Sequence, residues 1–296
     1  LPTAGTAGLN NFVGLALEDK FTAFTPRITF DYNVTDDSLL FASAARGVKS
    51  GGFNATATLV ENRRYGDDKN WTYEIGSKNT FNDGRVRLNG TLFMIRWTDV
   101  QIFAQDTGNP APLPISIVRN LGDVNSSGVE LEAAYVPTDN LNFSGTLYYG
   151  DAHYAKGTSD LRWGRVPAVC DDVVCKRNGD ISGLQTERQS KWQGTVSAEW
   201  QDELNMGNDL QYYLRSDVSY QSKQFNDAVN ISWIPGRTLV NASLGIQGEQ
   251  FDVQLWSRNL FDKKYVASVL VGVPNTQYNS YLGERRTFGV TLKARY

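Results

Sequence analysis

The sequence predicts an all-β fold, an antiparallel transmembrane β-barrel of which about eleven strands are present. Three observations predict it. Apolar and polar residues alternate with a period of two in one segment after another, and turn residues separate the segments. Most segments are about 8 to 12 residues long, close to the ~9 to 11 residues that a tilted strand needs to cross a bilayer. Short and long connections also alternate along the chain.

Each strand is expected to have one apolar and one polar face. In the segment that begins at Trp71, the side chains of Trp71, Tyr73 and Ile75 fall on one face, opposite Glu74 and Lys78. Further apolar sets are Val129, Leu131, Ala133 and Tyr135; Trp192, Val196, Ala198 and Trp200; Leu210, Tyr212, Leu214 and Val218; and Phe288, Val290, Leu292, Ala294 and Tyr296. In chain order, the expected strands cover residues 27–34, 39–48, 71–78, 86–100, 129–135, 141–149, 192–200, 210–218, 239–246, 251–260 and 288–296.

The connections give the strands an orientation. Short turns are expected at 35–37, 82–84, 137–140 and 248–249, with a longer turn near 202–208. Long connections are expected at 49–70, 105–116, 155–189, 223–236 and 262–284. Outer-membrane barrels show this asymmetry, with tight periplasmic turns and large extracellular loops. The faces of a soluble β-sandwich or propeller also alternate, but those folds give no reason for the long loops to share one side.

Aromatic residues near the strand ends are typical of the girdles that mark a membrane interface. They therefore favour lipid outside the sheet. These residues are Trp71, Phe81, Tyr135, Trp192, Trp200, Tyr220 and Tyr296.

Composition excludes several classes of protein. The 29 Lys and Arg residues balance 32 Asp and Glu residues to a net charge of −3, which leaves no basic surface for nucleic acid. Mean hydropathy is −0.39, and no apolar run reaches the ~18 residues of a membrane-spanning helix. For the two cysteines, Cys170 and Cys175, a local disulfide formed in an oxidising compartment is favoured over free thiols. With the single histidine, His153, they make no complete zinc site unless carboxylates contribute.

Several segments resemble the C-terminal half of TonB-dependent outer-membrane receptors. Residues 40–54 (LFASAARGVKSGGFN) and 71–78 (WTYEIGSK) are similar to strands and loop entries frequent in that family. So are residues 120–132, where NLGD leads into SGVELE, residues 258–265 (RNLFDKKY) and residues 286–292 (RTFGVTL). The matches follow the order of the family and cover nearly the whole chain, so together they are a specific signal.

The resemblance implies a plugged barrel of about 22 strands, of which residues 1–296 form the C-terminal portion. The N-terminal plug and the first half of the barrel are not in this chain. Open strand edges are not tolerated in lipid, so the rest of the same barrel or a complementary chain must complete the wall. Glycines within strands, such as Gly76, Gly128 and Gly289, would leave room for the plug.

The implied function is TonB-dependent active uptake of a scarce nutrient, by default a ferric siderophore or a similar chelate. The expected location is the outer membrane of a Gram-negative bacterium, with outer-membrane lipid and lipopolysaccharide around the wall. TonB would be a partner through the missing N-terminal region. No catalytic arrangement accompanies His153, and neither an enzyme nor a resident cofactor is expected. A passive outer-membrane porin and a secreted soluble β-sandwich carbohydrate-binding protein are the alternatives.

The candidate ligand-binding residues lie in the long loops. Arginine offers a planar positive fork to anions, and aromatic rings offer a flat apolar surface, which together suit an anionic chelate. Solvated loop charge with interfacial aromatics explains the same residues equally well. The candidates are Arg63, Arg64, Tyr65, Arg162, Trp163, Arg165, Trp233 and Tyr278. Polar residues expected to face the lumen and hold the plug are Glu74, Lys78, Glu130, Glu132, Arg215 and Asp217.

Overall fold

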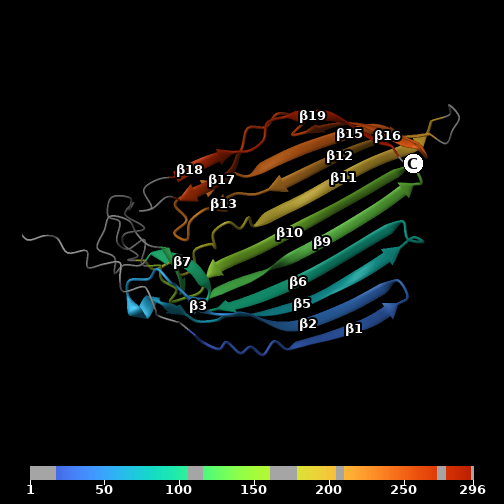
Figure 1. Cartoon of the computed structure of the whole chain (residues 1–296). Coiled ribbons are helices and arrows are strands. Elements are labelled where there is room, and N and C mark those ends of the chain that lie inside the picture. The colour runs from blue at the N-terminus through green and yellow to red at the C-terminus, as the bar shows by residue number, and fades with distance from the viewer. Residues whose placement is uncertain (1–17, 106–115, 161–178, 205–209, 272–277, 295–296) are drawn as a thin grey trace, which may run out of the picture.

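Eleven long strands form one antiparallel sheet, in which each strand pairs with the next long strand along the chain. The computed structural model describes residues 18–105, 116–160, 179–204, 210–271 and 278–294. The sheet curves into an open trough whose edges are β1 and β19 (Figure 1). The long strands are β1 (Arg27–Thr35), β2 (Ser38–Lys49), β5 (Asp68–Phe81), β6 (Val86–Thr98), β9 (Val124–Thr138), β10 (Leu141–Tyr154), β11 (Trp192–Glu203), β12 (Gln211–Gln221), β15 (Arg237–Gln247), β16 (Phe251–Arg258) and β19 (Thr287–Ala294).

All eleven expected strands are confirmed, and the largest difference lies at β9. The alternation predicted a strand over residues 129–135, whereas β9 runs from Val124 to Thr138. Backbone pairing with β6 and β10 continues through the polar residues Asn125 and Ser126. A hydrogen-bonded ladder depends on the main chain, so it extends beyond the part of the strand where the side chains alternate.

Short turns and long loops lie at opposite ends of the trough, as expected (Figure 1). Four of the long loops contain small two-stranded sheets. The sequence predicted only long connections there, because most of these strands are too short for a period to show. The small elements are β3 (Gly52–Phe53) with β4 (Arg64–Tyr65), the 3-10 turn η1 (Val60–Asn62) between them, β7 (Gln101–Gln105) with β8 (Ser116–Asn120), β13 (Gln224–Phe225) with β14 (Trp233–Ile234), and β17 (Val266–Val271) with β18 (Tyr278–Leu282).

The apolar face of the sheet is the convex, outer face, and none of the described segments covers it. Leu92, Val196, Leu214 and Val290 are 55–60% exposed, although each lies in the middle of a long strand. A β-sandwich would bury such residues against a second sheet. Among the described residues no second layer lies on this face, so the sandwich interpretation has no support.

Outward-facing aromatic rings pair near the loop end of the strands. The rings of Trp71 and Tyr73 stack with their centroids 6.0 Å apart. The rings of Tyr149 and Trp192, on the neighbouring strands β10 and β11, lie 4.5 Å apart. Such a belt of amphipathic rings is what a membrane interface selects.

Inward-facing glycines seat aromatic rings from the adjacent strand. A Cβ atom at Gly128 would come within 2.7 Å of the ring of Phe93, and one at Gly76 within 2.6 Å of the ring of Phe41. The pairs are Phe41 over Gly76, Phe93 over Gly128, Tyr213 over Gly245 and Trp256 over Gly289. The space that these glycines leave is therefore partly filled by the wall itself, not reserved for a plug.

The main buried apolar cluster lies at the loop end. Val124 and Tyr154, at the ends of β9 and β10, pack there with Val100, Ile181 and Val229 from three loops. This cluster fixes the loops to the sheet. Within the described ranges, no helix has the length and apolar character needed to span a bilayer.

Candidate functional site

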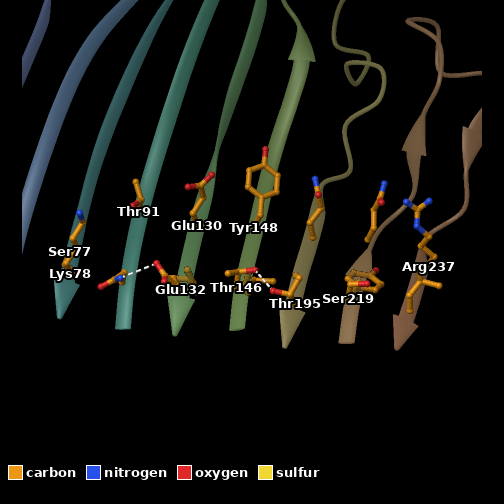
Figure 2. Close-up of a pocket in the computed structure, with 18 of the residues that line it drawn as sticks. Ser77, Lys78, Thr91, Glu130, Glu132, Thr146, Tyr148, Thr195, Ser219 and Arg237 are labelled. Carbon is orange, nitrogen blue, oxygen red and sulfur yellow. Dashed lines mark hydrogen bonds between the residues drawn. The ribbon is translucent and has the colours of Figure 1, made fainter. Parts of the chain in front are cut away.

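A polar hollow of about 630 Å³ lies on the inner face of the trough, and Figure 2 shows its lining. The strand register explains its composition, because residues directly opposite one another across an antiparallel sheet share one face. One row across six strands consists of Lys78, Asn89, Glu132, Thr146, Thr195 and Ser219. The next row toward the loops includes Thr91, Glu130, Tyr148, Gln193, Gln221 and Arg237.

Part of this surface is satisfied within the wall. The hydroxyl oxygens of Thr146 and Thr195 lie 2.8 Å apart, and the Asn89 amide donates to Glu132 Oε2 over 3.3 Å (Figure 2). Lys78 and Glu130, in contrast, make no ion pair within the described part of the chain. The hollow therefore presents both positive and negative groups to whatever fills the trough.

A compact charged cluster lies on the inner face nearer the turn end. Arg215 Nη1 lies 3.1 Å from Glu199 Oε2, and Arg215 Nη2 lies 2.8 Å from Asp217 Oδ1. Ser197 donates its hydroxyl to the same Asp217 oxygen over 2.6 Å. One arginine thus pairs with two carboxylates on adjacent strands, and a net charge of −1 remains.

At the loop end, the structure holds Arg63, Arg64 and Tyr65 in one ordered loop, here called the β3–β4 loop (residues 50–67). The guanidinium of Arg64 forms an ion pair with Asp19 and lies 5.8 Å from the centre of the Phe21 ring. Tyr65 pairs with Gly52 across β3 and β4. Since Arg64 already has an anionic partner, it is less available to a ligand than its sequence position indicated.

Asparagine side chains fix the β3–β4 loop to its neighbours. Asn54 donates to the carbonyl oxygens of Asn62 and Val118 and accepts from the backbone N–H of Val118, over 2.7–2.8 Å. Asn120 accepts from the backbone N–H of Gly66 and donates to the carbonyl oxygen of Asp99, both over 2.7 Å. Amide side chains replace backbone partners here, so the loops hold a defined shape without a large core.

A second group of loops gathers aromatic rings around one lysine. Lys223 Nζ lies 4.4 Å from the ring centre of Phe225 and 5.7 Å from that of Trp233, which is 54% exposed. Tyr278 lies in β18, where burial raises the pKa of its phenol and the negative charge of Asp227 raises it further. The structure thus places Trp233 beside a cation, Lys223, that was not among the predicted residues, whereas the charged neighbour of Tyr278 is Asp227.

These two groups of loops lie on opposite sides of the trough at its loop end, one around β3 and β7 and the other around β13, β17 and β18 (Figure 1). They flank the entrance to the polar hollow. The remaining predicted residues lie outside the described ranges: Arg162, Trp163, Arg165, Cys170 and Cys175. No cluster of three or more His, Cys, Asp or Glu residues that could hold a metal occurs in the described segments.

Comparison with known proteins assigns the family. The family model described as "TonB dependent receptor-like, beta-barrel" matches residues 4–260, well over half of the chain. The chain belongs to the TonB-dependent receptor family. The TonB-dependent receptor barrel also explains the trough, because an eleven-stranded open sheet is a partial barrel.

Curated relatives of this TonB-dependent receptor chain are named as receptors. It is 23% identical over 252 residues to the probable TonB-dependent siderophore receptor PiuA of Acinetobacter baumannii, covering 83% of this chain and 30% of PiuA. It is 24% identical over 264 residues to the metal-pseudopaline receptor CntO of Pseudomonas aeruginosa, covering 87% of this chain and 32% of CntO. The chain therefore spans about a third of the length of these relatives.

Solved structures of TonB-dependent receptors share the fold. The ferric yersiniabactin uptake receptor FyuA of Yersinia pestis matches with a TM-score of 0.72 at 18% identity, over 90% of this chain and 36% of FyuA. The ferric preacinetobactin receptor BauA of Acinetobacter baumannii matches with a TM-score of 0.67 at 21% identity, over 95% of this chain and 37% of BauA. At these sequence identities the similarity shows the fold but does not identify the ligand.

Proposed function

We propose that this chain forms the C-terminal half of the barrel of an outer-membrane active transporter, which takes up a ferric siderophore or similar chelate with energy supplied through TonB. Family membership supports the location, since TonB-dependent receptors are outer-membrane β-barrels of Gram-negative bacteria. The similarity to the siderophore receptor PiuA, the ferric yersiniabactin receptor FyuA and the ferric preacinetobactin receptor BauA supports the class of cargo. A plug and a TonB-contacting segment would come from the part of the receptor that precedes this chain.

The observation that carries the proposal is the polar inner face. Polar and charged groups on the inner face can form hydrogen bonds and ion pairs that hold a plug and release it. Lys78 and Glu130 are free to pair with plug residues, while Arg215 with its two carboxylates leaves one negative charge for a plug cation. Hydrogen bonds and partly solvated ion pairs of this kind are individually weak, so a pulled plug can break them one after another.

Capture would take place at the loop end. Lys223 beside the rings of Phe225 and Trp233 offers charge and flat apolar surface in one place, which suits an anionic chelate with aromatic or amide groups. Arg63 and Tyr65 would contribute from the opposite side of the entrance, and Arg64 would do so only after leaving Asp19. Arg162, Trp163 and Arg165, with a disulfide between Cys170 and Cys175 to stiffen their loop, complete the proposed ligand-binding set.

A passive porin is the second candidate, and energy dependence separates the two. In a strain that lacks its own receptor for a chosen ferric siderophore, the full-length receptor should restore uptake of ⁵⁵Fe-siderophore. That uptake should stop when TonB is deleted or the proton gradient is dissipated. Uptake that is insensitive to both treatments would show passive diffusion and overturn the proposal.

The proposed capture site has its own test. Trp233→Ala should raise the KM of TonB-dependent uptake by about fivefold or more, because exposed aromatic anchors carry a large share of binding energy. Phe261→Ala removes a ring that is 75% exposed, and serves as the matched control with unchanged KM. Equal KM values for the two variants would remove Trp233 from the site while leaving the transport proposal intact.

A further inference from the structure

A second recess lies on the outer face of the barrel wall, at the loop end of β6, β9 and β10. It has a volume of about 500 Å³, and its lining includes Met94, Arg96, Asn125, Ser127 and His153. The strand register places Arg96 directly opposite Asn125, and Asn125 directly opposite His153. These three polar side chains therefore form one row across three adjacent strands.

The alternation of the strands decides which face this row occupies. Arg96 lies four residues from Leu92 in β6, Asn125 lies six from Leu131 in β9, and His153 lies six from Leu147 in β10. Even separations place side chains on the same face of a strand. The row therefore shares the outer, apolar face with these leucines, and it is separated from the polar hollow by the thickness of the sheet.

The depth of the row in the membrane follows from strand geometry. Asn125 and Tyr135 lie ten residues apart on the outer face of β9, with Tyr135 near the turn end. Ten residues span about 33 Å of strand, or about 25 Å along the membrane normal at a tilt of about 40°. The apolar band of a transmembrane barrel is also about 25 Å tall. The row thus lies where the hydrocarbon ends and the outer-leaflet headgroups begin.

Around the recess, one cation, Arg96, has no anionic partner among the residues that the structure describes. Asp151, one row closer to the hydrocarbon, pairs with Lys191 over 2.6 Å. Asp123, at the rim, accepts the backbone N–H of Asp99 over 3.1 Å, but it has no cationic partner among the described residues and keeps its negative charge. Arg96 is exposed and makes no ion pair within the described residues. An unpaired guanidinium beside an amide and an imidazole, at the edge of an apolar surface, is costly next to lipid unless a ligand supplies the anion.

We propose that this recess binds a phosphate group of the phosphorylated glycolipid of the outer leaflet, the lipid A part of lipopolysaccharide. Arg96 would bind two phosphate oxygens with its planar fork, and Asn125 and His153 would each donate an N–H group. Met94 and the leucines below would contact the acyl chains. The inference rests on placing the chain in the outer membrane, but it concerns the opposite face from the transport site and does not depend on the cargo.

The test measures binding of purified lipid A to the full-length receptor by native mass spectrometry in detergent, after removal of co-purified lipid. Arg96→Gln should weaken lipid A binding about tenfold, the size expected for losing a charge-assisted hydrogen-bonded pair. Arg87→Gln makes the same change on the same strand but on the inner face near the turn end, and it should bind lipid A like the native receptor. Arg96→Lys keeps the positive charge but lacks the planar guanidinium. Its affinity for lipid A should lie between those of the Arg96→Gln variant and the native receptor.

Three comparisons make the assignment falsifiable. Lipid A stripped of its phosphates should bind the native receptor as weakly as intact lipid A binds the Arg96→Gln variant. Phosphatidylglycerol and inorganic phosphate should compete poorly with lipid A. Equal binding by the Arg96→Gln and Arg87→Gln variants, equal binding of dephosphorylated lipid A, or tighter binding of phosphatidylglycerol would each overturn the proposal. Siderophore uptake, measured separately, should be unchanged in Arg96→Gln, so failure of the transport proposal would be seen independently.

Discussion

Arg215 holds the carboxylate of Asp217 on the inner face of β12, with guanidinium Nη2 2.8 Å from Oδ1 and Nε 3.1 Å from both oxygens. Its Nη1 atom donates to Glu199 Oε2 on β11 over 3.1 Å. The two residues lie two positions apart on one strand, so the strand itself aligns them. The arginine is the only cation in contact with either carboxylate within the described residues.

Replacing this arginine should destabilise the wall. Arg215→Met leaves two facing carboxylates without a cation, and we expect the free energy of unfolding to fall by about 1 kcal/mol. Thermal unfolding of the full-length receptor in detergent measures the change. Adding Glu199→Gln to the variant should recover part of the loss, because it removes the repulsion. A variant as stable as the native receptor would show that the cluster contributes nothing to stability.

The aromatic rings that pack over inward-facing glycines predict a packing defect when such a glycine is replaced by alanine. A Cβ atom at Gly128 would lie 2.0 Å from the carbonyl oxygen of Tyr149, as well as against the ring of Phe93. Gly128→Ala should therefore lower the free energy of unfolding by about 1 to 3 kcal/mol, the usual cost of overpacking. At Gly66 the nearest atom would be 3.5 Å away, an ordinary contact, so Gly66→Ala is the matched control. The midpoint temperature of unfolding, measured by heat-dependent migration of the folded barrel on gels, compares the two variants. Equal midpoint temperatures would show that a Cβ atom at residue 128 is tolerated beside the ring of Phe93.

Asn120 should control the order of two loops. It contacts backbone atoms of Gly66 and Asp99, and through them it joins the β3–β4 loop to the loop that contains β7 and β8. Asn120→Ala should accelerate amide exchange in residues 50–67, whereas Asn33→Ala, at an exposed position of β1, should not. Hydrogen–deuterium exchange of the intact receptor reads both segments. Unchanged exchange in residues 50–67 would mean that the loop is held by other contacts.

The connection between β16 and β19 should be sensitive to acid. The guanidinium of Arg285 and the backbone N–H of Arg286 hold the pKa of Asp262 well below its ordinary value of 3.8. A carboxyl whose pKa is lowered in the folded state stabilises that state at pH values above the ordinary pKa, and the contribution is lost as the pH falls toward the lowered value. Amide exchange in residues 259–286 should thus be constant from about pH 7 to pH 5 after correction for intrinsic rates, and rise below about pH 4. Asp262→Asn should remove this rise, and a rise of equal size in that variant would contradict the assignment.

Side-chain alternation was sufficient to predict the sheet. Within residues 71–78, the outward Trp71 and Ile75 and the inward Glu74 and Lys78 occupy the predicted faces, because lipid and lumen select opposite residue types at every second position. A separate pattern, the alternation of short and long connections, predicted that the turns and the long loops lie at opposite ends. Local pattern and family resemblance agreed on this part of the fold.

The loop architecture could not be predicted in the same way. Asn54 and Val118 are 64 positions apart, and their contact creates the shape of two loops without any local sequence period. Lys223 lies beside Trp233 only because β13 pairs with β14, each two residues long. The seat of Phe93 on Gly128 likewise depends on the register between β6 and β9. Long-range pairing decided each of these contacts.

The measurement that decides between lipid and water on each face is spin-label accessibility in liposomes. Labels are attached to the full-length receptor, with Cys170 and Cys175 replaced by serine, through Leu214→Cys and Val290→Cys on the outer face and Ser219→Cys on the inner face. The two outer labels should relax rapidly with lipid-soluble oxygen and slowly with a water-soluble nickel chelate, and the Ser219→Cys label should show the reverse. Outer labels that respond to the nickel chelate as strongly as the inner one would contradict the membrane barrel, and the receptor function with it.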